Sequence, residues 1–131
     1  MMAEPEKSLN DIIREDGRYP TEAYAFLQES LAKAVKDVHG DKAGPGGQSH
    51  VTGRQLCEAA RDLALERWGY MAKAVLAKWH IAKTIDFGNM VYLLIKHNQL
   101  RKTDEDSIED FRDVYDFAQA FGRKKTFELR E

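Results

Sequence analysis

The segment from residue 84 to residue 100, TIDFGNMVYLLIKHNQL, is the longest strongly apolar and periodic stretch of the chain. Its apolar residues recur at the i, i+3, i+4, i+7, i+8 spacing of one helical face; they are Phe87, Met90, Val91, Leu94 and Ile95. A helix with such a stripe is stable when the stripe is buried. We therefore expect the chain after residue 52 to pack around this helix.

Both ends of this segment carry residues that are typical of helix termini. Thr84 is expected to be the N-cap, because its hydroxyl can accept a hydrogen bond from a backbone N–H of the first turn. Asp86 places a negative charge near the positive end of the helix dipole. Asn98 tolerates the left-handed conformation that ends many helices. The sequence predicts a helix that begins at Thr84 and stops at Asn98.

The opposite face of the predicted helix carries the candidate contact residues Asn89, Tyr92, Leu93 and Lys96. Tyr92 and Leu93 are too large and apolar for a face that meets only water. Either residues 111–121 cover them within the chain, or a partner protein or a second copy does. An aromatic and aliphatic centre with a polar edge is the composition of a protein–protein interface. We therefore predict a binding or adaptor module that contacts a protein partner or itself.

Cap residues and apolar spacing predict further helices before the central one. They are one or two turns from residue 9 to the turn at 16–18, a helix over 21–39 after Pro20, a helix opened by the capping box Thr52-x-x-Gln55 and ending near residue 68, and a shorter helix over 70–79.

The chain after the central helix carries weaker signals. Residues 100–103 predict a short strand, and residues 123–130 alternate as a terminal strand would. Ser107 and Asp110 form a possible helix cap. The apolar residues that follow fit a helix over 111–118 or, across 114–117, a strand.

This order of elements predicts a mainly α fold, a compact helical domain with a helix-turn-helix or winged-helix-like core and a small two-stranded sheet. A chain of 131 residues fits one domain. We expect residues 1–8 to be disordered and residues 9–131 to form the domain, with a glycine-rich loop at 40–49.

The net charge of −2 is unevenly distributed, which supports an alternative function in nucleic-acid binding. Residues 49–102 carry nine basic and four acidic side chains. In a winged-helix core the cations that would contact phosphates are Arg54, Arg61, Lys73, Lys78, Lys83, Arg101 and Lys102. Against this alternative, the central helix offers only Asn89 and Lys96 for reading bases, and phosphates would repel the acidic stretch at 104–110.

The sequence carries no strong pattern for catalysis or cofactor binding. The four histidines and the single cysteine, Cys57, are too widely spaced for a zinc site, and Cys57 is expected to be buried as a small hydrophobe. The acidic stretch from Asp104 fails the EF-hand pattern, which requires glycine at the sixth position and glutamate at the twelfth. We therefore expect no metal, no cofactor and no enzymatic activity.

The N-terminal residues are polar and acidic, and the apolar run at 91–95 is too short to span a bilayer. We expect a cytoplasmic protein that does not enter membranes.

Four strings in the chain are DGRYPTEAYAF at 16–26, HVTGRQL at 50–56, DFGNMVYLLI at 86–95 and KTDEDSIEDFRDVYDF at 102–117. In this order they resemble a family of uncharacterised bacterial proteins, the Minf-type conserved hypothetical proteins. The resemblance covers about residues 9–121. It implies a single domain of bacterial origin, and it implies no activity, cofactor or catalytic residue.

Overall fold

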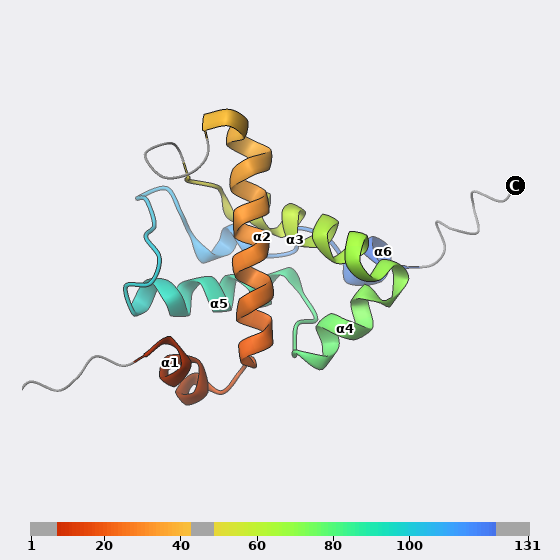
Figure 1. The fold of residues 1–131 in the computed structure, drawn as a ribbon, viewed down its shortest axis with the longest axis horizontal. Helices are drawn as coiled ribbons and strands as arrows, with labels where there is room; N and C mark the ends of the chain where they lie inside the picture. The colour runs from red at the N-terminus through yellow and green to blue at the C-terminus, as the bar shows by residue number, and fades with distance from the viewer. Residues whose placement is uncertain (1–7, 43–48, 123–131) are drawn as a thin grey trace, which may run out of the picture.

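The computed structural model describes residues 8–42 and 49–122, which are mainly helical (Figure 1). In chain order the elements are α1 Leu9–Asp16, α2 Thr21–His39, the 3-10 helix η1 Gly40–Lys42, α3 Gly53–Trp68, the 3-10 helix η2 Gly69–Met71, α4 Ala72–Lys78, α5 Thr84–Lys96, the 3-10 helix η3 Ile108–Phe111 and α6 Phe117–Ala120. The predicted mainly α class is therefore confirmed.

The predicted sheet is not found in the part of the chain that the structure describes. Residues 100–103 contain no strand, and the backbone N–H of Thr103 donates to the Asp106 carboxylate at 2.8 Å instead of to a neighbouring strand. The terminal strand expected at 123–130, the loop at 43–48 and residues 1–7 lie outside the described ranges. Residue 8, predicted to be disordered, is the N-cap of α1.

The helices predicted before the central one begin and end close to the expected residues. The α2 helix spans the predicted residues and follows Pro20, which occupies the N-cap. At the start of α3, Thr52 and Gln55 form the expected capping box. The Thr52 hydroxyl accepts from the Gln55 N–H at 3.1 Å, and the Gln55 side chain accepts from the Thr52 N–H at 2.9 Å. These boundaries follow from local bonds that the sequence makes visible.

The central helix is α5, and its predicted apolar stripe faces the core. Phe87 and Met90 have no exposed surface, and Val91 and Leu94 are buried beside them. Asn98 has the predicted left-handed conformation, with φ of 62°. The chain thus turns away from the axis of α5 two residues after the helix ends.

The prediction that Thr84 is the N-cap of α5 is wrong, because Lys83 occupies that position. Thr84 is buried, and its hydroxyl donates to the carbonyl oxygen of Phe111 at 2.6 Å while accepting from the Val114 N–H at 3.1 Å. Its tertiary contacts therefore replace the local cap bond. Asp86 supplies the local bond, since its carboxylate accepts from the Lys83 N–H at 2.9 Å.

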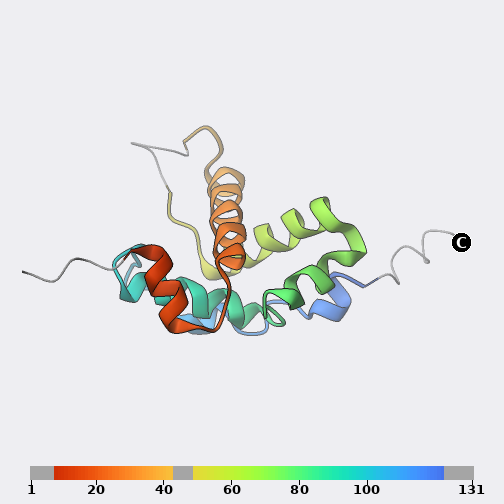
Figure 2. The ribbon, with the colours of Figure 1, turned by 60° about the horizontal axis from the view of Figure 1, so that its bottom comes forward.

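The helices pack in two directions around α5. In both views α2 stands steeply across α5, while α3 and α4 diverge from a common corner (Figures 1 and 2). The α2 helix packs along α3, and η3 packs against α5 and α3.

Phe111 of η3 locks this arrangement, because its ring lies directly over two glycines. A Cβ atom on Gly88 would lie 2.8 Å from the Phe111 side chain, and one on Gly53 would lie 2.9 Å from it. The absence of side chains at both positions lets η3 approach α3 and α5 closely.

The two tryptophans, one at the end of α3 and one just after α4, pack together against Phe26 of α2, and we call this cluster the aromatic corner. Ring centroids are 5.4 Å apart for Phe26 and Trp68, 5.9 Å for Phe26 and Trp79, and 5.7 Å for the two tryptophans. Such tilted and edge-on aromatic contacts stabilise a core beyond the area that they bury.

Candidate binding groove

The four predicted contact residues of α5 lie in different environments. Leu93 is 8% exposed and belongs to the core, so it has little surface to offer a partner. Asn89 is half-buried in a polar cluster, and Lys96 is exposed. Tyr92 is half-buried and lines a groove. The structure therefore does not bring the four together on one open face.

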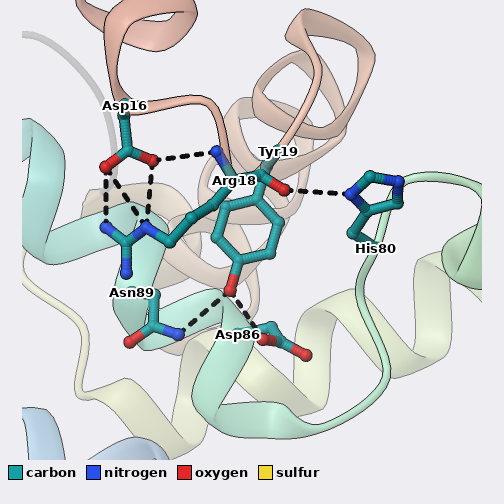
Figure 3. Close-up of polar contacts among 6 residues, drawn as sticks. All are labelled: Asp16, Arg18, Tyr19, His80, Asp86 and Asn89. Carbon is teal, nitrogen blue, oxygen red and sulfur yellow. Dashed lines mark hydrogen bonds and ion pairs between the residues drawn. The ribbon is translucent and has the colours of Figure 1, made fainter.

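Asn89 belongs to a hydrogen-bonded cluster that joins the α1–α2 turn to α5 (Figure 3). The Tyr19 hydroxyl donates to Asp86 at 2.6 Å and accepts from the Asn89 side-chain amide at 3.0 Å. The second carboxylate oxygen of Asp86 accepts from the N–H groups of Ala82 and Lys83. Burial raises the pKa of Tyr19 to about 12.

The same turn is tied down by two further contacts (Figure 3). The Arg18 guanidinium pairs with Asp16 at 3.0 Å, and His80 Nδ1 lies 3.1 Å from the Arg18 carbonyl oxygen. The Tyr19 hydroxyl and the Asp86 carboxylate are thus engaged by internal partners. The arrangement holds the turn between α1 and α2 against α5.

A groove lies between α2, α5 and the segment that follows α5. It consists of two cavities of about 640 Å³ each. They share the lining residues Leu31, Val35, Ser49, Leu56, Val91, Gln99 and Leu100. The shared side chains are mainly aliphatic, so the floor of the groove is apolar. We call this feature the α2–α5 groove.

Tyr92 lines one end of the α2–α5 groove. Its ring packs edge-on against Phe111, with centroids 6.4 Å apart. Its hydroxyl is inaccessible to solvent and has no hydrogen-bond partner among residues 8–42 and 49–122. Burial, together with the charges of Asp106 and Asp110, raises the pKa of Tyr92. An unsatisfied buried hydroxyl costs free energy.

His50 and Asp106 join two segments at the rim of this end. His50 Nε2 lies 3.2 Å from both oxygens of Asp106. Burial raises the pKa of Asp106, but the hydrogen bonds from the Thr103 N–H and from His50 outweigh that effect and leave it below its usual range. His50 therefore connects the segment before α3 to the turn after α5.

The rim of the α2–α5 groove is electrically polarised. Lys36, Arg101 and Lys102 line it as exposed cations, and none has an ion-pair partner in the described ranges. Asp106 and Asp110 lie on the η3 side. A bound molecule would thus meet charges of both signs at the rim: cations at Lys36, Arg101 and Lys102, and carboxylates at Asp106 and Asp110.

The seven cations of the nucleic-acid alternative are dispersed over the fold. Arg54 pairs with Glu58 at 3.4 Å, and Arg61 pairs with Asp62 at 3.0 Å. Lys73 and Lys78 lie on α4, Lys83 precedes α5, and Arg101 and Lys102 follow it. Within α5 itself, seven of thirteen residues are buried and Lys96 alone is exposed. A helix that enters a DNA groove needs an exposed face, and α5 offers little of one.

Cys57 has no exposed surface, as expected from the sequence, and burial raises the pKa of its thiol to about 12. A thiol in this environment stays protonated and is a poor nucleophile at neutral pH. Among the described residues, no three His, Cys, Asp or Glu side chains gather in a way that would hold a metal ion. No described helix is long and apolar enough to cross a membrane.

The α2 wall of the groove is the part that the sequence did not reveal. Leu31 and Val35 continue the apolar stripe of α2, and both are half-buried and line the groove. The stripe extends along a nineteen-residue helix, and α3 crosses only part of that helix (Figure 1). The length of the stripe is therefore the sequence feature that could have indicated an uncovered apolar surface on α2.

No protein-family model, curated protein or solved structure matches this chain. The resemblance to the Minf-type family therefore stays a prediction from the four strings.

Proposed function

We propose that this protein is a non-enzymatic binding module that makes protein–protein contacts through the α2–α5 groove. The observation that supports this most is the groove itself, a concave apolar surface with Tyr92 at one end and charged residues on its rim. Buried aromatic anchors inside a polar rim are typical of the centres of protein interfaces. Tyr92 is the predicted contact residue that serves as the anchor.

The half-buried side chains of the groove give the proposal an energetic basis. Leu31, Val35 and Ile95 keep part of their apolar surface exposed in the free protein. Covering such surface is favourable by about 25 cal/mol per Å² of apolar area. A partner that inserts apolar side chains here gains that free energy without needing any reaction at the site.

The test uses a library of displayed peptides and two variants of α2. Val35 lines both cavities, whereas Val38, one turn further on, lines neither and is 40% exposed. We expect peptides selected on the wild type to bind Val38→Glu equally well and to lose binding to Val35→Glu. Circular dichroism and thermal unfolding confirm that both variants fold.

Peptides that bind Val35→Glu as well as the wild type, or no enrichment at all, would contradict the proposal. Retardation of DNA or RNA that weakens with salt and with Lys78→Glu plus Lys83→Glu would instead favour the nucleic-acid alternative.

A further inference from the structure

Resting on the proposed function, we propose that the α2–α5 groove takes an amphipathic α-helix of a partner protein, with an acidic flank against α2 and the segment after α5. The inference concerns the chemistry of the occupant. It draws on the secondary structure around the groove and on the charges of its rim.

The secondary structure of the walls indicates a helical occupant. No strand in the described part of the chain offers an edge with free N–H and C=O groups. A partner segment that enters the apolar groove must therefore satisfy its own backbone hydrogen bonds, since unpaired polar groups are costly to bury. An α-helix does so along its whole length. Binding of an amphipathic helix in an apolar groove is a recurrent mode of recognition.

The apolar floor indicates which face of the partner helix is buried. Leu31 and Val35 lie one turn apart on α2, and Val91 and Ile95 lie one turn apart on α5. Both pairs line the groove together with Leu56, on two helices that cross steeply. A partner helix with apolar side chains spaced three and four residues apart along one face would cover these side chains.

The rim charges indicate the flanks. Lys36 of α2 and Arg101 and Lys102 after α5 line the groove and have no ion-pair partner in residues 8–42 and 49–122. Acidic side chains of the partner would neutralise them and steer its approach. Near η3 the flank would be a lysine or arginine, because Asp106 and Asp110 repel a carboxylate.

Two fluorescein-labelled peptides test this directly. Both are amphipathic helices of about 18 residues, roughly 27 Å long, with the same apolar face and with either glutamates or lysines on the flank that meets Lys36, Arg101 and Lys102. Fluorescence anisotropy at low salt should show tighter binding of the acidic peptide by roughly tenfold, with the ratio falling as salt rises.

Two matched pairs of charge reversals test which cations cause the preference for the acidic peptide. Arg101→Glu plus Lys102→Glu should abolish or reverse the preference for the acidic peptide. Lys73→Glu plus Lys78→Glu changes the net charge equally, but these residues lie on α4 and line neither cavity of the groove. This second pair should leave the preference unchanged.

The outcomes separate this inference from the proposed function. Equal affinity for the two peptides, with both excluded by Val35→Glu, would overturn the acidic flank and leave the binding module standing. Binding of neither peptide would overturn the helical occupant, while the displayed library still decides whether the groove binds proteins. A dimer in sedimentation equilibrium that only Val35→Glu dissociates would make the occupant a second copy and overturn a separate partner.

Discussion

Tyr19 and Tyr24 flank the start of α2 and are both buried, but their hydroxyls differ in what they contact. The Tyr19 hydroxyl bonds to both Asp86 and Asn89 of α5. The Tyr24 hydroxyl has no partner in the described residues. Because the two tyrosines are similarly buried, replacing each one shows how much a hydrogen-bonded hydroxyl contributes to stability compared with an unbonded one.

We expect Tyr19→Phe to lower the free energy of unfolding by about 1–3 kcal/mol, because Asp86 and Asn89 each lose a buried partner. Tyr24→Phe should be neutral or stabilising, because the change removes a buried hydroxyl that makes no hydrogen bond. Urea unfolding of the two variants beside the wild type measures both effects. Equal changes in the two variants would show that the hydrogen bonds of the Tyr19 hydroxyl add no net stability.

Residue identity made some contacts predictable and concealed others. Cys57 was expected to be buried because its neighbours are apolar, and Tyr92 stood out because an aromatic residue is unusual on a polar face. The role of Thr84 was hidden, since a threonine before an apolar run is equally suited to capping. Its actual partners, Phe111 and Val114, lie far along the chain. A sequence pattern reports local bonds more readily than such tertiary ones.

At the scale of elements, the close approach of η3 to α5 depends on Gly88. We expect Gly88→Ala to destabilise the protein by about 1–3 kcal/mol, because the added methyl group overlaps the Phe111 side chain in a packed core. Helix propensity alone would favour alanine by about 1 kcal/mol.

The double variant Gly88→Ala plus Phe111→Ala provides the control, measured by urea unfolding. Its loss should be smaller than the sum of the two single losses, because alanine removes the ring carbons that the added methyl group would meet. Additive losses would show that the methyl group and the ring do not meet.

The elements themselves divide into those that local chemistry specifies and those that it does not. The boundaries of α2, α3 and α5 were predictable because periodicity, proline, glycine and capping residues mark them. In the stretch from Leu100 to Asp116 only the Ser107–Asp110 cap was predictable, because the rest of the backbone is held by the Asp106 carboxylate and by remote groups such as the hydroxyl of Thr84. This stretch lines the groove, so the shape of the groove could not be predicted from the sequence.

At the scale of the whole molecule, buried tyrosine and cysteine side chains make the free energy of unfolding depend on pH in the alkaline range. Burial raises the pKa of Tyr19, Tyr24 and Cys57 to about 12 each. In the unfolded chain these groups release their protons at about pH 8.5–10. Between that range and pH 12 the folded state binds more protons, so the free energy of unfolding falls as the pH rises.

We therefore expect the urea midpoint to be steady near neutral pH and to fall between about pH 9 and pH 12. The variant Cys57→Ala plus Tyr24→Phe should show a shallower fall, because two of the linked groups are gone. A midpoint that stays level across this window, or a double variant with the slope of the wild type, would contradict the linkage.

The aromatic corner of Phe26, Trp68 and Trp79 has a practical consequence for following the molecule in solution. The chain contains two tryptophans, and both lie at this corner. Intrinsic emission excited at the indole bands therefore reports on one junction of α2, α3 and α4, while far-ultraviolet dichroism averages over every helix. If the two signals change together during denaturation, the corner and the remaining helices melt as one cooperative unit.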